Sequence, residues 1–382
     1  MSLRVLLVRP RASGGLAAHV DQEHTALEEA GAEVHASGAV IGERPSPRAD
    51  GSAVRGLRRE VTSLRSTGPI AVHAHGLRAG ALAAIAVRSL RPARGAAPVR
   101  LVVTLHNRTV GGTAVRAMGV VLLRILTSRA DVVLAVSPDL AEQAARAGAR
   151  EVLHAVVPAP GAAPDAGDAG TAGASAGPGD PADPADPSDS ADPAGPAEPA
   201  GAGPSLDVLV IARLAPQKGL PDLLDAVAAL ERDPGTRGRV RVGIAGDGPL
   251  RQALAERIAA EQLPVDLLGR REDVPALLAR ADLVVSAARW EGQPVALQEA
   301  LRAGRAIIAT DAGGTRWVTQ EAATLVPVGD APALASAILE HLDPAVRRHG
   351  EQASRQRARS LPGAREMTDQ LLDVLAPRDP RW

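Results

Sequence analysis

Residues 161–204 lack the large side chains that a hydrophobic core requires. They are almost entirely Gly, Ala, Pro, Asp, Ser and Thr, with eight acidic residues and no basic one. A segment with so little to bury and a uniform negative charge is predicted to be a disordered, partly polyproline-like linker, with a partner-binding tail as the alternative. The linker divides the chain into two predicted domains, residues 1–160 and 205–382, each long enough to enclose its own core.

The composition excludes several classes of function. The 382 residues contain no cysteine, which rules out disulfides, thiolate chemistry and cysteine-bound zinc. Phe and Tyr are absent and the formal net charge is -1, so the stacking platforms and basic balance of nucleic-acid-binding proteins are missing. The first apolar run ends at Arg9 and Pro10, too early for a signal peptide, and no stretch approaches the roughly 20 residues of a membrane span. We therefore expect a cytoplasmic protein, with at most peripheral contact at the inner membrane face.

The first predicted domain is the basic one. Residues 1–160 hold 20 arginines and 12 acidic residues, an excess of eight positive charges. Arg55, Arg58, Arg59 and Arg65 have a spacing that favours one face of a helix. This cluster predicts contact with an anionic membrane or a phosphorylated acceptor, and solvated surface arginines are the alternative.

Short runs of Val, Ile and Leu alternate with Ala-rich helical stretches on both sides of the linker. The alternation is typical of parallel strands that crossover helices bury on both faces. The predicted strands are Arg4–Val8, Glu33–Ala36, Ile70–His75, Leu101–Leu105, Val132–Val136 and Val152–Val156, followed after the linker by Leu206–Ile211, Val240–Ala245, Val265–Leu268, Leu283–Ser286, Ala306–Thr310 and Thr324–Val326. Two doubly wound α/β sheets bind ligands at the carboxyl ends of their strands, so the predicted site is a cleft between the domains.

Two loops at strand ends of the second domain carry groups that suit a diphosphate. Arg213 and Lys218, the one lysine of the chain, bracket the loop after the first strand. Two cations at a strand end can neutralise a leaving pyrophosphate. Gly246 and Gly248 form a glycine turn after the next strand. Solvated charges and a purely structural turn are the alternatives.

The most specific element begins as Glu291-Gly292-Gln293-Pro294 and continues to Glu299. Its two carboxylates lie eight positions apart at the start of a predicted helix. Ionised carboxylates accept paired hydrogen bonds, which the neighbouring hydroxyls of a sugar or ribose can donate. The alternative is a pair of solvated helix acids. The next predicted strand, Ala306–Thr310, is followed by the turn Gly313-Gly314. Polar or glycine residues therefore follow four of the predicted strands of the second domain.

Together these motifs make the chain resemble the family 4 retaining glycosyltransferases, which have the GT-B architecture of two Rossmann-like domains. The resemblance covers nearly the whole chain outside the linker and is most specific over residues 206–330. It implies that Arg213 and Lys218 meet the donor diphosphate. It also implies that Glu291 engages the transferred sugar and Glu299 the ribose. The remaining donor-site residues that it implies are Gly246, Gly248, Gly292, Gln293 and Pro294.

In the N-terminal half the resemblance points to one glycine loop and to histidines. Gly14 and Gly15 look like the glycine loop near the donor phosphates, although a Gly-Gly pair after a strand is often only a tight turn. His106, at a predicted strand end, is expected beside the donor sugar. His73 and His75 share one face of a strand. They either contact the substrate or lie in the core with their hydrogen bonds satisfied, and both alternatives stay open.

The resemblance implies an enzyme that moves a hexosyl group from a nucleotide-diphosphate sugar to an unidentified hydroxyl acceptor, with retention of configuration and with no metal or other cofactor. The chain has no Asp-x-Asp sequence and no histidine cluster with the spacing of metal ligands. A sugar-nucleotide epimerase is an alternative, because the fold hosts more than one chemistry. A non-catalytic homologue that binds sugar nucleotides is another, because Ala212, Trp317 and residues 159–161 depart from the family pattern.

Overall fold

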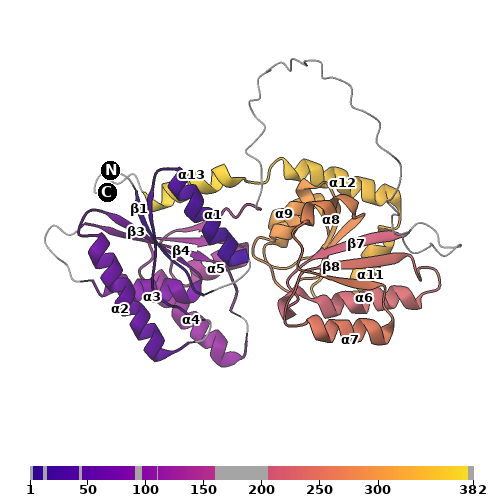
Figure 1. The fold of residues 1–382 in the computed structure, drawn as a ribbon, viewed down its shortest axis with the longest axis horizontal. Helices are drawn as coiled ribbons and strands as arrows, with labels where there is room; N and C mark the ends of the chain where they lie inside the picture. The colour runs from indigo at the N-terminus through magenta and orange to yellow at the C-terminus, as the bar shows by residue number, and fades with distance from the viewer. Residues whose placement is uncertain are drawn as a thin grey trace, which may run out of the picture.

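The computed structural model describes residues 3–11, 15–42, 45–90, 97–109, 111–159 and 205–376. Figure 1 shows these residues as two α/β domains side by side. The predicted linker, residues 161–204, lies outside the described residues, as does Gly14.

The first domain is built on a six-stranded sheet in the order β2-β1-β3-β4-β5-β6, and every pair in it is parallel. Its strands are β1 (Arg4–Val8), β2 (Glu33–Ala36), β3 (Ile70–His75), β4 (Val99–Leu105), β5 (Val132–Ala135) and β6 (Val152–His154). Its helices are α1 (Gly15–Glu29), α2 (Pro47–Leu64), α3 (Leu77–Arg88), α4 (Thr113–Thr127) and α5 (Pro138–Arg146).

The second domain has a six-stranded parallel sheet in the order β12-β11-β10-β7-β8-β9. Its strands are β7 (Leu206–Ile211), β8 (Val240–Ala245), β9 (Val265–Gly269), β10 (Leu283–Ser286), β11 (Ala306–Thr310) and β12 (Thr324–Val326). Its helical elements are η1 (Pro216–Lys218), α6 (Leu220–Arg232), α7 (Arg251–Glu261), α8 (Val274–Arg280), α9 (Val295–Arg302), α10 (Thr315–Thr319), η2 (Gln320–Ala322), α11 (Ala331–Glu340) and α12 (Pro344–Ala358).

The sequence accounts for these elements locally. The central strands are runs of aliphatic residues, and all positions of β3 and β11 are buried, as expected for parallel strands covered on both faces. Helix α2 starts where Ser46 accepts a hydrogen bond from the backbone N–H of Ala49, with Pro47 in the first turn. The predicted fold class, two Rossmann-like domains of GT-B type, is confirmed, and each observed strand lies within two residues of its predicted bounds.

The last helix, α13 (Ala364–Leu375), belongs to the first core rather than to the second. Met367 and Leu371 are buried with the residues of the first sheet. The Gln370 amide bonds the backbone at both Val156 and His154, at 2.8 and 2.7 Å. The prediction placed all of residues 205–382 in the C-terminal domain. The position of α13 corrects this, because the helix packs in the first domain. Its buried residues pack against segments more than 200 residues earlier in the chain, a contact that local pattern does not encode.

Among the described residues, no helix is both long enough and apolar enough to cross a bilayer.

Candidate active site

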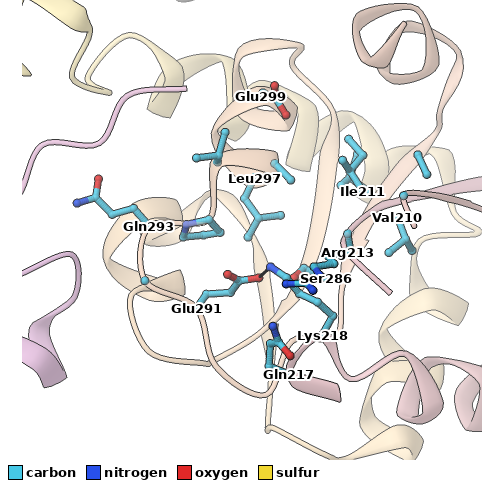
Figure 2. Close-up of a pocket in the computed structure, with 18 of the residues that line it drawn as sticks. Val210, Ile211, Arg213, Gln217, Lys218, Ser286, Glu291, Gln293, Leu297 and Glu299 are labelled. Carbon is cyan, nitrogen blue, oxygen red and sulfur yellow. Dashed lines mark hydrogen bonds and ion pairs between the residues drawn. The ribbon is translucent and has the colours of Figure 1, made fainter. Parts of the chain in front are cut away.

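A cleft of about 590 Å³ lies between the two domains. Its walls include the residues that follow β4 and β5 in the first domain and those that follow β7, β8 and β10 in the second. The carboxyl ends of both parallel sheets therefore face one shared space, which is where doubly wound folds bind ligands. Figure 2 shows the second-domain side of this pocket.

The loop after β7 places two cations in the cleft. Arg213 is exposed and has no side-chain partner among the described residues, while the Nζ of Lys218 forms an ion pair with Oε1 of Glu291. Figure 2 shows these three side chains converging at the centre of the pocket. The Lys218 and Glu291 side chains are 24% and 14% exposed, so solvent screens the pair only in part. An anionic ligand that displaced Glu291 would find two positive charges already in place.

A left-handed glycine fixes the direction of this loop. Gly219 has φ +62°, and a Cβ at that position would lie 1.8 Å from the carbonyl oxygen of Ala287. Any other residue would therefore push the loop away from β10. The close approach keeps Lys218 beside the cleft.

The two glycines of the turn after β8 have different roles. Gly246 has φ +148° and lines the cleft, and a Cβ there would lie 1.9 Å from the carbonyl oxygen of Ala212. Gly248 was predicted to bind the donor, but it does not line the cleft. It packs against the backbone of Leu214, where a Cβ would come within 2.5 Å of the carbonyl oxygen. We therefore assign Gly248 to backbone packing of the two loops.

The Glu291–Gly292 turn is held between the two domains. A Cβ at Gly313 or Gly314 would lie 2.1 or 2.0 Å from the carbonyl oxygens of Glu291 and Gly292, and the N–H of Gly314 donates to the Glu291 carbonyl at 2.9 Å. On the other side, a Cβ at Gly292 would lie 2.6 Å from the Val136 side chain of the first domain. Gly313 and Gly314 thus let two backbone segments approach closely, and Gly292 leaves room for the Val136 side chain, so the three glycines fix the position of the turn that carries Glu291.

Glu299 lines the same cleft from α9, whose N-cap residue is Pro294. Burial raises the pKa of Glu299, and nearby Arg302 lowers it in part. Figure 2 shows Glu299 well away from Glu291, with Leu297 lying between the two carboxylates. The cleft therefore offers two separate carboxylates, as binding the hydroxyls of two different sugars would require.

Gln293 was predicted to bind the donor, yet both polar atoms of its amide are engaged elsewhere. It donates to the carbonyl of Ala155 and accepts from the N–H of Val157 at 3.1 Å. Buried Gln298 repeats the pattern: it donates to the carbonyl of Val157 at 2.9 Å and accepts from the N–H of Ala159 at 3.2 Å. Gln293 lines the cleft, but its amide joins the end of the first domain to the loop before α9, and Gln298 joins it to α9 itself. Sequence reasoning missed Gln298, because a glutamine within a helix normally faces solvent.

His106 lines the cleft after β4, opposite the second-domain residues. Its Nε2 lies 3.1 Å from Nδ1 of His75, and Nε2 of His73 lies 2.8 Å from the Thr104 hydroxyl. His73 and His75 are fully buried and do not line the cleft, so they have the place in the core that the sequence left open. His106 alone of the three can reach a ligand.

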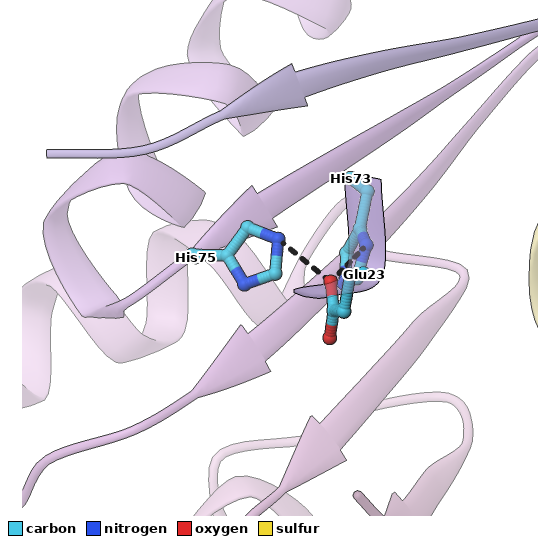
Figure 3. A group of neighbouring side chains, drawn as sticks. All are labelled: Glu23, His73 and His75. Atoms are coloured by element: carbon cyan, nitrogen blue, oxygen red, sulfur yellow. Dashed lines mark ion pairs between the residues drawn. The ribbon is translucent and has the colours of Figure 1, made fainter. Parts of the chain in front are cut away.

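A buried carboxylate, Glu23 on α1, lies at the centre of these histidines (Figure 3). Its Oε2 is 3.2 Å from Nε2 of His75 and 3.4 Å from Nδ1 of His73, and its Oε1 is 2.8 Å from Nε2 of His19. Burial raises the pKa of Glu23, but the surrounding histidines lower it by more than burial raises it. The pKa therefore lies below its ordinary value and the carboxyl stays ionised. Burial lowers the pKa of His73 and His75, and that of His106 to about 3.

Glu23, His73 and His75 also form the group of described residues whose ligand atoms lie close enough to hold a metal ion, within 4.8 Å of one another. This group could not be predicted from the chain, because the carboxylate comes from α1 and the histidines from β3, about 50 residues further along. The group is buried behind His106 and is separate from the cations of the second domain.

Replacing Glu23 with Gln is expected to lower the free energy of unfolding by about 3 kcal/mol at pH 7, because it removes the buried anion that the imidazoles face. Urea unfolding measures this, and Glu28→Gln on the exposed side of the same helix is the control.

The parent should also lose stability as the pH falls. The folded-state pKa of His106 is about 3, so below about pH 6.5 only the unfolded chain takes up its proton, a difference of about 2 kcal/mol by pH 5. A flat stability profile from pH 7 to 5 would contradict a His106 that stays neutral in the folded protein.

Several cleft residues were not predicted from the sequence. Gly15 begins α1, and the first turns of that helix present Leu16 and His19 to the cleft. On the other side, Ser286 and Arg270 line it at the ends of β10 and β9. A single Ser or Arg after a strand carries no distinguishing pattern, so only the fold identifies these positions.

Two facing Rossmann-like domains with charged strand ends around one cleft define a protein of the GT-B class. A family model described as a glycosyl transferase 4-like domain matches residues 2–160, and the model of the glycosyl transferases group 1 matches residues 205–343. The chain belongs to the group 1 glycosyltransferase family.

Curated relatives match over shorter segments. The chain is 32% identical over 143 residues to an alpha-D-kanosaminyltransferase of Streptomyces kanamyceticus, a match that covers 36% of each protein. It is 37% identical over 94 residues to an alpha-1,4-N-acetyl-D-galactosaminyltransferase of Campylobacter jejuni, covering 25% of this chain and 26% of that relative. The matches thus span about a third and a quarter of the two relatives.

Solved structures match over nearly the whole chain. HepE of Anabaena, in complex with UDP and glucose, has a TM-score of 0.67 at 18% identity, covering 99% of this chain and 100% of that one. Sucrose-phosphate synthase of Thermosynechococcus elongatus has a TM-score of 0.69 at 16% identity, covering 97% of both chains. At these identities the likeness establishes the fold.

Proposed function

We propose that this protein is a retaining glycosyltransferase that moves a hexosyl group from a nucleotide-diphosphate sugar to a hydroxyl acceptor. One observation carries the proposal: Arg213, Lys218, Glu291 and Glu299 meet in one interdomain cleft, with His106 facing them from the other domain. The complexes of HepE with UDP, with UDP and glucose, and with UDP-glucose support a nucleotide-sugar donor.

The residues have distinct roles in this proposal. Arg213 and Lys218 bind the diphosphate and stabilise the charge that develops as it departs, so these two cations supply the neutralisation for which other enzymes recruit a metal. Glu291 binds the sugar and Glu299 the ribose. His106, neutral because burial lowers its pKa, offers a hydrogen bond to the donor sugar without adding charge.

The chemistry exchanges one bond for another at the anomeric carbon. The bond to the diphosphate oxygen breaks and a bond to the acceptor oxygen forms on the same face, while the acceptor proton passes to the departing phosphate. The diphosphate thus serves as the base. No side chain of the chain is assigned to that step.

Incubation with UDP-, GDP- and ADP-sugars, followed by NMR of the anomeric proton, tests this function. In the absence of an acceptor we expect only slow hydrolysis that keeps the anomeric configuration. Conversion of the donor into a second sugar nucleotide would establish the epimerase instead. A donor that binds but is neither hydrolysed nor transferred, with any acceptor offered, would favour the non-catalytic homologue.

The acceptor side of the proposal rests on the first domain. The relative from Campylobacter jejuni is named for a saccharide carried on undecaprenyl diphosphate. We propose that the basic first domain of this chain makes a peripheral contact with an anionic membrane. For a cytoplasmic enzyme this contact would be with the inner face of the membrane. Arg55, Arg58 and Arg59 are exposed on α2, which supports that contact, whereas Arg65 is half-buried at the end of the helix.

A further inference from the structure

Three polar atoms in the core of the first domain have no hydrogen-bond partner among the described residues. They are Oε2 of Glu23, Nδ1 of His73 and Nε2 of His75, and Figure 3 shows the two rings directed at the carboxylate. The side chains are at most 2% exposed, so bulk water does not reach them. Buried polar atoms nearly always have a partner, because an unpaired one is costly. Three such atoms at one point therefore call for a partner that all three share.

The spacing of these atoms matches a tetrahedral metal site. Oε2 of Glu23 lies 3.2 Å from Nε2 of His75 and 3.4 Å from Nδ1 of His73, and the ligand atoms of the three residues all lie within 4.8 Å of one another. Zinc bonds to nitrogen or oxygen are about 2.0–2.2 Å long, which places two ligands of a tetrahedron about 3.4 Å apart. A hydrogen bond from an imidazolium to a carboxylate is shorter, about 2.7–2.9 Å. The distances therefore favour a shared cation over a shared proton.

The far nitrogen of each imidazole already has a partner. Nε2 of His73 lies 2.8 Å from the Thr104 hydroxyl oxygen, and Nδ1 of His75 lies 3.1 Å from Nε2 of His106. Histidines that bind metals typically donate the N–H of their other ring nitrogen in this way, which fixes the ring and its tautomer. With the protons on the far nitrogens, the inner nitrogens turn their lone pairs toward the carboxylate of Glu23. A cation between them replaces that repulsion with attraction.

The ligand set indicates which kind of ion fits. Two imidazoles and one carboxylate suit Zn²⁺, whereas Mg²⁺ and Ca²⁺ prefer oxygen ligands. Iron(II) uses the same three ligands where coordination positions stay open to substrates. Glu23, His73 and His75 do not line the cleft, so their burial favours the closed site of a structural zinc ion.

An ion at this point would join two elements that are far apart in sequence. Glu23 lies on α1, and the two histidines lie on β3, which is hydrogen-bonded between β1 and β4 in the first sheet. His19, one turn before Glu23 on α1, lines the cleft, and its Nε2 lies 2.8 Å from Oε1 of Glu23. His19 therefore connects the cluster to the cleft, from which an ion can enter, and it is the adjacent imidazole for a fourth zinc position.

We propose that Glu23, His73 and His75 bind a Zn²⁺ ion that cross-links α1 to β3. The ion stabilises the first domain and takes no part in sugar transfer. Arg213 and Lys218 belong to the second domain, so the neutralisation of the diphosphate that we propose for them needs no contribution from this ion. The zinc site stands on the geometry of the first domain and does not depend on the proposed function.

Elemental analysis of the full chain, purified without a metal-affinity tag, tests the site. We expect about one zinc ion per chain, which dialysis against a chelator removes. Zn²⁺ returned to the metal-free protein should raise the thermal midpoint by about 5 °C or more, because a ligand of the folded state stabilises it, and Mg²⁺ should not. Co²⁺ in place of zinc should give the intense visible absorption of a tetrahedral site.

Three single variants assign the ion to these residues. Glu23→Gln should weaken zinc binding at least about 100-fold, because it removes the charged ligand. Thr104→Val keeps the size of a buried side chain but removes the partner of His73, so it should weaken zinc binding about tenfold. His24→Gln, at the exposed pair of α1 with Glu28, is the matched control and should bind like the parent. Competition with a chromogenic chelator measures the affinity of each variant.

Metal content separates a zinc site from a purely ionic cluster, since Glu23→Gln lowers the free energy of unfolding in both cases. A parent chain without zinc, whose thermal midpoint and Co²⁺ spectrum show no binding, would overturn the proposal and leave the three groups sharing protons. Equal zinc binding by Glu23→Gln, or its loss in His24→Gln, would place the ion elsewhere and also overturn it. Iron found in place of zinc would contradict the proposed metal. If Glu23→Gln does not fold, Thr104→Val and the Co²⁺ spectrum of the parent decide the question.

Discussion

Lys218→Ala is expected to reduce sugar transfer by about two orders of magnitude or more, the loss typical of removing one preorganised electrostatic group. The Lys218 ammonium lies in the cleft, held there by the left-handed Gly219, and it pairs with Glu291 before any ligand binds. When a diphosphate departs, this charge is already in position. The change should leave stability nearly unaltered, because a partly exposed ion pair contributes at most about 1 kcal/mol.

A charge-matched control separates this local role from the overall charge. Arg237 is exposed before β8, at the end of the sheet opposite the cleft, so Arg237→Ala should transfer sugar like the parent. Steady-state kinetics and thermal midpoints of both variants beside the parent are the measurement. Unchanged turnover in Lys218→Ala would remove Lys218 from the site, and an equal loss in Arg237→Ala would point to a general charge effect.

The two glutamates of the cleft are expected to fail in different ways. Glu299→Ala should weaken binding of free nucleoside diphosphate about tenfold, because it removes the acceptor of the ribose hydroxyls. Glu291→Ala should spare that binding and cut transfer about 100-fold, because its partner is the sugar. Figure 2 shows Leu297 between the two carboxylates, which supports separate partners for them. Calorimetry with the diphosphate and kinetics with the full donor measure the two effects.

The ion pair between Lys218 and Glu291 sharpens this experiment. Removing Glu291 frees the ammonium, so Glu291→Ala should bind the diphosphate as tightly as the parent or more tightly. Glu256→Ala, on the exposed surface of α7, is the control and should change neither quantity. If Glu291→Ala lost diphosphate binding while Glu299→Ala kept it, the two roles would have to be exchanged.

The two sheets, and the edge of each at which the site lies, could be predicted from the order of residues along the chain. Aliphatic runs of strand length, separated by helical stretches, define buried parallel strands, and the carboxyl ends of parallel strands meet at one edge. Arg213, Lys218, Glu291 and Glu299 each lie within a few residues of such an end or on the helix that follows it. Local pattern was therefore enough to predict that they line one cleft.

Which side chains at that edge serve packing rather than binding became clear only from the folded protein. Gly248 supports a neighbouring loop and the Gln293 amide joins two domains, although both stand in motifs that resemble ligand sites. Glu23 lies among histidines of β3, and α13 returns to the first core. In each case the deciding contact joins segments far apart in sequence. Such contacts depend on how the elements are placed in space, and periodicity along the chain carries no record of that placement.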